Sequence, residues 1–285
     1  MSVPRILRVL PLLMVMGTFQ ATNADVRRDL QYGQVGDIGL KMDAYVPPTE
    51  GLHPAAIIVH GGGWVTGDRQ WSVSPLFQPL EQAGFAWFSI SYRFANDVLQ
   101  FGAAVEDVQQ AIHYVREHAS EYRIDPARIV LIGESAGAHL GTLAAMREPD
   151  ALAGVVALYC PSDLETLAQN ARFIPDAVRQ MLSSGGLAKL FLNRLRDLSP
   201  INHVRQGLPP FLLIHGTADS VVPFDQSLRF RAKLREAGVP CDLVEVTGGG
   251  HGMRWWQQSG QTTAYRKQMI DWLKNAAAVG IHSGN

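Results

Sequence analysis

A serine stands between two glycines at the start of a candidate helix. The stretch RIVLIGESAGAHL places Ser135 directly after the apolar residues 128–132 and before helix-like sequence that begins at Ala136. A strand that passes into a helix this abruptly makes a strained turn, and this turn exposes the serine Oγ. The glycines two positions away on either side allow the strand and helix backbones to pass close together. The sequence therefore predicts that Ser135 is a nucleophile.

Two further residues could activate this serine. His251 lies in the glycine-rich segment TGGGHGM, and an imidazole is the natural base near neutral pH. Asp219 follows the apolar run PFLLIHG and could accept a hydrogen bond from the histidine, which would fix its tautomer. Asp163, in YCPSDL, is the alternative acid one strand earlier. We favour Asp219 because its loop is expected to lie beside the histidine loop.

The fourth part of the predicted site is the glycine run HGGGW at residues 60–64. Acyl transfer passes through a tetrahedral oxyanion, which backbone amides must already face. We predict that the amides of Gly62, Gly63 and Ala136 are these donors. The alternative is a phosphate-binding loop, but both the G-x-G-x-x-G and the P-loop patterns are absent.

Apolar strands alternate with amphipathic helices along the chain. We expect strands at 26–34, 38–47, 55–62, 85–93, 128–133, 154–160, 210–216 and 241–246. We expect helices at 75–84, 101–122, 136–146, 224–237 and 262–278. This alternation predicts an α/β fold with a mostly parallel sheet of about eight strands and helices on both faces. Sites in such sheets form beyond the carboxyl ends of the strands, where the candidate residues fall.

Two segments depart from this alternation. Residues 1–24 carry two arginines, then a short apolar run, then small residues, which is typical of a secretory signal. An uncleaved membrane anchor is the alternative, although the apolar run is short for a span of roughly 30 Å. Residues 25–285 then form a single domain, in which 163–206 is a possible lid or cap-like insertion beyond the sheet.

The composition excludes several classes of protein. The 285 residues are 47% hydrophobic, which suffices for one large α/β core, and the net charge is −1. Without a basic stripe we expect no nucleic-acid partner. The nine histidines show no paired ligand spacing with a carboxylate, so we expect no metal site. Hydrolysis by a serine triad needs no cofactor, and we expect none. Cys160 and Cys241 are expected at opposite ends of the sheet, hence as free buried thiols.

Other side chains could contribute to the site or support it. Trp64 and Trp255 are candidates for lining a substrate pocket, as aromatic rings suit an acyl or aromatic group. His139, one helical turn after Ser135, is expected to pack beneath the turn rather than to act in catalysis. Asp107 is expected to be a structural hydrogen-bond acceptor.

Together these motifs resemble the α/β-hydrolase superfamily, and more narrowly its esterase and lipase branch with an HGGGW oxyanion motif. That branch includes hormone-sensitive-lipase-like carboxylesterases, acetyl-xylan and feruloyl esterases, and kynurenine formamidase-like enzymes. The resemblance covers about residues 35–278 and rests on VHGGGW, ISYR, RIVLIGESAGAHL, LLIHGTADSVVP and GGGHGM. It implies an α/β-hydrolase fold, with Ser135, His251 and Asp219 in the roles given above. Glu134 stands where the hormone-sensitive-lipase branch usually has Asp, which favours the small esterases with little cap.

The expected function is therefore a serine carboxylesterase that forms an acyl-enzyme and cleaves short-chain or cell-wall-type acyl esters. Its expected partner is a small-molecule or polysaccharide-linked ester. The same triad could instead serve an amidase, peptidase or formamidase, and a hydrolase scaffold could serve as a non-catalytic binding protein. We expect a periplasmic or secreted protein without stable membrane insertion after signal cleavage; the oligomeric state stays open.

Overall fold

A computed structural model describes residues 26–95, 100–170, 186–258 and 264–279 of the chain. The predicted signal segment 1–24 lies outside the described residues. None of the helices in the described ranges is both long enough and apolar enough to cross a bilayer.

Eight strands form one sheet in the order β1-β2-β4-β3-β5-β6-β7-β8. β1 and β2 pair antiparallel at one edge, and β2 pairs antiparallel with β4, whereas the pairs from β4 to β8 are parallel. This confirms the predicted mostly parallel α/β sheet with a leading antiparallel pair. The strands are β1 (Arg27–Val35), β2 (Ile38–Tyr45), β3 (His53–Val59), β4 (Ala86–Ile90), β5 (Ile124–Glu134), β6 (Gly154–Leu158), β7 (Phe211–Gly216) and β8 (Cys241–Val246).

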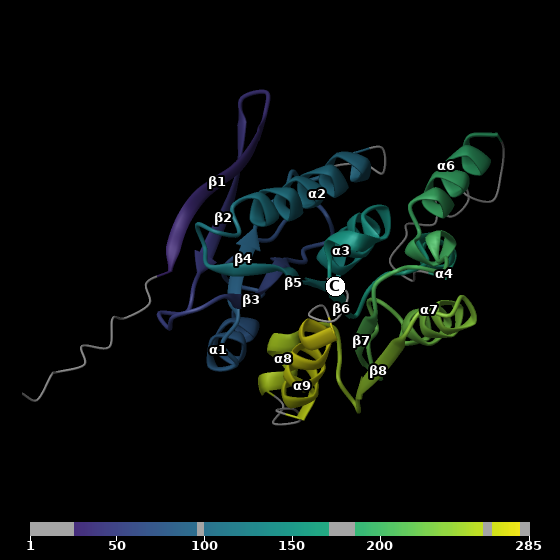
Figure 1. The fold of residues 1–285 in the computed structure, drawn as a ribbon. Helices are drawn as coiled ribbons and strands as arrows, with labels where there is room; N and C mark the ends of the chain where they lie inside the picture. Colours follow the sequence, from purple (N-terminus) through teal and green to yellow (C-terminus); the bar gives the residue numbers. More distant parts are fainter. Residues whose placement is uncertain (1–25, 96–99, 171–185, 259–263, 280–285) are drawn as a thin grey trace, which may run out of the picture.

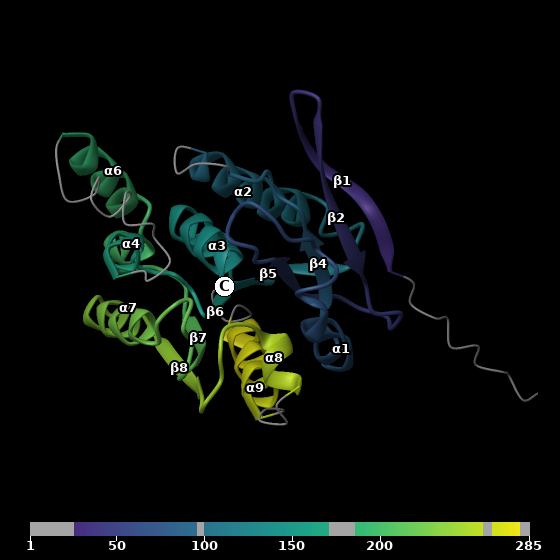
Figure 2. The ribbon, with the colours of Figure 1, turned by 180° about the vertical axis from the view of Figure 1, so that it is seen from behind.

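Helices cover both faces of this sheet (Figures 1 and 2). Successive side chains of a strand point to opposite faces, so Ile57 and Ile58 of β3 enter two different apolar clusters. The first cluster lies under α2, α3 and α7, and the second lies under α1, α8 and α9. The helices of these two layers are α1 (Ser74–Gln82), α2 (Phe101–Glu117), α3 (Ala136–Arg147), α7 (Asp225–Glu236), α8 (Met253–Gln258) and α9 (Ala264–Val279). Burial on both faces explains why the central strands are continuously apolar.

The parallel register brings the loops after β3, β5, β6, β7 and β8 to one edge. Val59 pairs with Gly133, and Gly133 pairs with Ala157. At the other end of the series, Gly216 pairs with Val246. These parallel strands end at nearly the same level, so the loops that follow them lie together. The predicted site residues Ser135, Asp219 and His251 therefore lie at one edge of the sheet.

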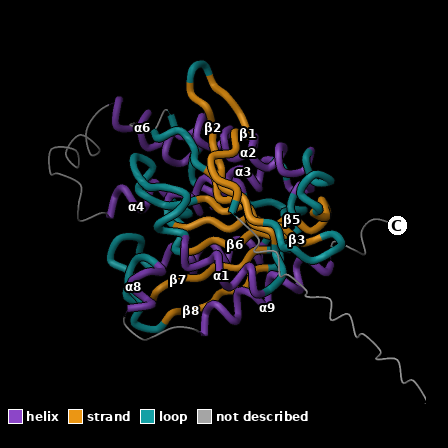
Figure 3. Tube along the Cα trace, turned by 90° about the vertical axis from the view of Figure 1, so that its left-hand side faces the viewer, coloured by secondary structure: helices purple, strands orange, loops and turns teal. Residues whose placement is uncertain are grey.

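The interval 163–206 contains α4 (Leu164–Asn170), α6 (Gly186–Asp197) and a 3₁₀ turn at Pro200–His203. Residues 171–185, between α4 and α6, lie outside the described residues. Figure 3 shows α4 and α6 beyond one end of the strands. A small cluster of Leu164, Leu195 and Leu198 packs there against Phe101, which attaches the interval to the start of α2.

The eight predicted strands and five predicted helices agree with the structure apart from their ends. The short helix α8 directly follows the glycine-rich histidine loop and was not predicted. Cys160 and Cys241 are buried free thiols, as expected. Burial raises the pKa of both thiols to about 12, so neither is a reactive thiolate.

Candidate active site

The backbone turn at Ser135 is strained, as the sequence predicts. Ser135 has φ 51° and ψ −120° directly between β5 and α3. A Cβ at position 137 would lie 2.3 Å from the carbonyl oxygens of Val59 and His60, and one at position 133 would lie 2.6 Å from the Cα of Ala138. These contacts explain why both positions are glycine. The hydroxyl is therefore held clear of the sheet at the start of α3.

The three predicted triad side chains meet above this edge. Ser135 Oγ lies 2.9 Å from His251 Nε2. On the other side of the ring, His251 Nδ1 lies 2.7 Å from Asp219 Oδ2. This geometry permits Nδ1–H to donate to the carboxylate while Nε2 accepts from the serine hydroxyl, which is the arrangement of a general base.

The side chain of Asp219 is fully buried, and its carboxylate accepts several hydrogen bonds. Its Oδ1 accepts from the amides of Val221 and Val222, each at 2.9 Å. Burial raises the pKa of the Asp219 carboxyl, but hydrogen bonds from His215 and His251 outweigh this effect and hold the pKa well below its usual range. The group is therefore an anion across the whole neutral range.

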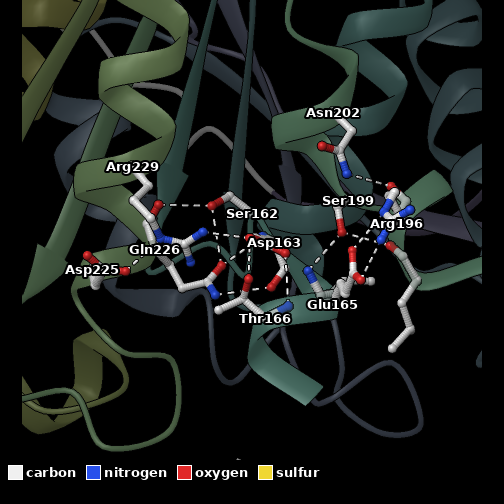
Figure 4. Close-up of polar contacts among 12 residues, drawn as sticks. Ser162, Asp163, Glu165, Thr166, Arg196, Ser199, Asn202, Asp225, Gln226 and Arg229 are labelled. Atoms are coloured by element: carbon white, nitrogen blue, oxygen red, sulfur yellow. Dashed lines mark hydrogen bonds and ion pairs between the residues drawn. The ribbon is translucent and has the colours of Figure 1, made fainter. Parts of the chain in front are cut away.

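The alternative acid, Asp163, is engaged elsewhere (Figure 4). Its Oδ2 accepts from Arg229 Nη1 and from Thr166 Oγ1, each at 2.6 Å. Gln226 accepts from the Asp163 amide at 2.7 Å and donates to its carbonyl at 3.1 Å. Asp163 thus joins α4 to α7, and the preference for Asp219 agrees with the geometry.

The glycine run after β3 lines the same cavity as Ser135. Gly62 and Gly63 have φ values of 121° and 59°, and a Cβ at position 62 would lie 2.0 Å from the Thr66 carbonyl oxygen. Within the part of the chain that the structure describes, no acceptor is assigned to the amides of Gly62 and Gly63. Ala136 is buried as the first residue of α3. Gly62 and Gly63 therefore lie beside Ser135 along the cavity, which is compatible with the predicted oxyanion site.

A cavity of about 630 Å³ opens over the serine and histidine. Trp64 lines it, as expected, and so does Trp71, which the sequence did not single out. Trp255 is not among the lining residues and is 67% exposed. The physical reason lies in α8, where Trp256 is buried against Tyr159 and Tyr265 and thereby turns its neighbour Trp255 toward solvent.

Two further residues of the cavity are not predicted by the sequence. Glu134 and Tyr159 both line the cavity and bond to each other, although the sequence pattern assigns neither of them to the site. The position of Glu134 beside the nucleophile was the available signal. His139 and Asp107 behave as expected: both are buried, and Asp107 accepts bonds from Arg93.

The described residues contain no group of three or more His, Cys, Asp or Glu side chains arranged to hold a metal ion. Ser135, His251 and the glycine run line the cavity.

Comparison with known proteins shows which family the chain resembles. Residues 42–234 match the BD-FAE family model. The probable carboxylic ester hydrolase LipM of Mycobacterium tuberculosis (strain ATCC 25618 / H37Rv) is 29% identical over 73% of this chain and 51% of its own length. The chain spans about half the length of the curated relatives it matches.

Solved structures extend the similarity to almost the whole fold. A truncated carbohydrate esterase from gut microbiota has a TM-score of 0.73 and 26% identity, covering 90% of this chain and 97% of that one. Esterase Est2 of the planctomycete Thermogutta terrifontis has a TM-score of 0.71 and 26% identity, covering 91% and 93%. That esterase has also been solved with propionate bound, with butyrate bound and phosphorylated by paraoxon. These neighbours confirm the resemblance to α/β-hydrolase esterases.

Proposed function

The chain belongs to the BD-FAE family, and from this premise we propose that it is a serine carboxylesterase. The observation that carries the proposal is the hydrogen-bonded series from Ser135 Oγ through His251 to Asp219, at 2.9 Å and 2.7 Å, beside a glycine loop that lines the same cavity. The names of the relatives support the same reaction class, since they are ester hydrolases.

In the proposed mechanism, Ser135 Oγ attacks the acyl carbon while its proton passes to His251 Nε2. The carbonyl oxygen becomes an oxyanion, and the amides of Gly62, Gly63 and Ala136 stabilise it. When this intermediate collapses, the bond to the alcohol oxygen breaks and His251 returns the proton to the leaving alcohol. An acyl-enzyme on Ser135 remains.

Deacylation repeats these steps with water in place of the alcohol. His251 takes a proton from the water as it attacks the acyl carbon, and it then protonates Ser135 Oγ as the acid departs. In both halves of the reaction Asp219 holds the imidazole in the tautomer whose Nε2 can accept a proton. It also stabilises the imidazolium that forms, because its carboxylate stays ionised.

For the substrate we propose short-chain or cell-wall-type acyl esters, on a small molecule or linked to a polysaccharide. The Thermogutta esterase with propionate or butyrate bound supports a short acyl chain, and the carbohydrate esterase from gut microbiota supports a sugar-linked one. The signal-like sequence of residues 1–24 supports a periplasmic or secreted location.

The direct test replaces Ser135 by alanine. We expect Ser135→Ala to lose the hydrolysis of p-nitrophenyl acetate while its circular dichroism and thermal melting stay close to wild type. Wild type should also release one equivalent of p-nitrophenol when it reacts with paraoxon, and Ser135→Ala should release none. Full esterase activity in the alanine variant would refute the proposed nucleophile.

Rates on a panel of substrates decide between the remaining alternatives. Acetyl, butyryl, octanoyl and feruloyl esters, together with an anilide and a formamide, separate an esterase from an amidase or formamidase. A folded wild type that neither turns over any of these nor reacts with paraoxon would instead be a binding protein on a hydrolase scaffold.

A further inference from the structure

We propose that Glu134 and Tyr159 are positioning residues, which hold the glycine loop and the histidine loop in register with Ser135. This inference rests on the proposed esterase function. It is carried by a series of hydrogen bonds that runs from the amide of Gly61 through Glu134 and Tyr159 to the amide of Met253.

Glu134 occupies the centre of this series. It is the residue directly before Ser135, and only 5% of it is exposed. Its Oε1 accepts from the Gly61 amide at 3.1 Å, and its Oε2 accepts from the Tyr159 hydroxyl at 2.5 Å. Gly61 immediately precedes the proposed oxyanion donors, so one carboxylate links the nucleophile turn to the loop that must face the oxyanion.

Tyr159 carries the connection to the histidine. It directly follows β6 with φ 39°, a strained value for a residue with a large side chain. Its hydroxyl accepts from the amide of Met253 at 3.2 Å, two residues after His251. Its ring packs edge-on against the His251 ring, with the centroids 4.8 Å apart. Both the ring and the hydroxyl therefore support the histidine loop.

Only one arrangement of protons satisfies every atom of the series. The Met253 amide must donate to the Tyr159 oxygen, so the Tyr159 proton must point to Glu134. Burial raises the pKa of Tyr159 well above its ordinary value, with Glu134 acting in the same direction, which keeps this proton in place. The residue at position 134 must then accept two hydrogen bonds and donate none, which an ionised carboxylate does and an amide does not.

Four loops of the catalytic edge are joined in this way. They follow β3, β5, β6 and β8, and their relative positions determine where the amides and the imidazole lie around the acyl carbon. A displacement of about 1 Å in such a site can lower the rate roughly 100-fold. Loss of these hydrogen bonds should therefore lower kcat much more than it weakens substrate binding.

The test compares Glu134→Gln, Tyr159→Phe and the double variant with wild type. Asp107→Asn is the matched control, because it makes the same carboxylate-to-amide change at a buried residue that pairs with Arg93 outside the cavity. Paraoxon titration counts the reactive serines by the p-nitrophenol released, and kcat for p-nitrophenyl acetate is then expressed per titrated serine.

We expect both single variants to lose roughly 10- to 100-fold in kcat per titrated serine, with KM changed less than about threefold. In the double variant the two losses should combine to less than their product, because both changes act on the one bond between Glu134 and Tyr159. Asp107→Asn should lower the melting temperature and keep kcat per titrated serine.

Three results would overturn the inference. These are unchanged turnover per titrated serine, a loss confined to the number of titrated serines, or losses that multiply in the double variant. If Glu134→Gln does not fold, Tyr159→Phe, which keeps the ring against His251, decides the matter by the same per-serine readout. An inactive wild type would instead remove the proposed esterase function, so the two failures are distinguishable.

Discussion

The indole Nε1–H of Trp64 donates a hydrogen bond to Nδ1 of His139 at 3.1 Å. The other nitrogen of the same ring, Nε2, donates to the carbonyl oxygen of Leu198 at 2.8 Å. These two bonds require a neutral imidazole with its proton on Nε2. His139 thus joins Trp64, at the end of the glycine run, to Leu198, which directly follows α6. It also packs beneath the turn at Ser135, as expected.

Protonation of His139 should therefore destabilise the protein in acid. Burial lowers the pKa of His139 to about 4, from an ordinary value of 6.5. Above pH 6.5 the imidazole is neutral in both states, whereas between pH 6.5 and about 4 mainly the unfolded chain binds the proton. The free energy of unfolding should consequently fall across this window, by roughly 2–3 kcal/mol from this residue.

Urea unfolding at pH 7 and pH 4.5 measures this contribution when wild type is compared with His139→Gln. The glutamine can still accept from Trp64 and does not titrate, so its stability should depend less on pH by the stated amount. An equal pH dependence in the two proteins would show that His139 is not the group responsible.

Asp219→Asn should abolish most activity without unfolding the chain. The new amide presents N–H to His251 Nδ1, which forces the ring proton onto Nε2 and prevents it from accepting the Ser135 proton. We expect kcat to fall about 10⁴-fold. Asp163→Asn is the control: it lies in the network of Figure 4 and should keep kcat within a few-fold. The opposite ranking of the two variants would assign the acid to Asp163.

Gly62→Ala should disrupt the proposed oxyanion loop. The added methyl would lie 2.0 Å from the Thr66 carbonyl oxygen, so the backbone must shift and carry the neighbouring amides with it. The loss of one oxyanion donor costs roughly 3 kcal/mol of barrier, or about 10²-fold in kcat. Gly51→Ala is the control: its φ of 92° is also well outside the range of ordinary residues, but no atom lies within 4 Å of the new methyl, and it should keep kcat. Steady-state kinetics of both variants test whether contact at position 62, rather than strain alone, affects catalysis.

Gln226→Leu should destabilise the fold through the network that attaches 163–206 to α7. The carboxamide of Gln226 is the partner of both the amide and the carbonyl of Asp163 (Figure 4). Leucine has a similar volume but leaves these buried groups unsatisfied, which we expect to cost about 2–4 kcal/mol in urea unfolding. Gln31→Leu, on the exposed side of β1, should change stability by less than about 0.5 kcal/mol. A similarly small effect at position 226 would show that water replaces the lost bonds.

The sequence by itself determined the strand and helix order, the strained serine turn, and the strand ends on which Ser135, Asp219 and His251 lie. Each of these follows from local patterns: continuous apolar runs predict buried strands, and glycines mark places where the backbone must turn or approach another segment. The expectation of two free thiols also followed, because strand direction alone separates Cys160 from Cys241.

Only the tertiary structure decided which side chains touch. The link from Glu134 to Tyr159 joins adjacent parallel strands, so it depends on their order and register rather than on spacing along the chain. Asp163 bonds to α7 through Arg229, whereas Asp219 bonds to His251. Trp255 is exposed because Trp256 fills the core. Such contacts arise between segments far apart in sequence, where the free energy of packing selects one arrangement that no local pattern encodes.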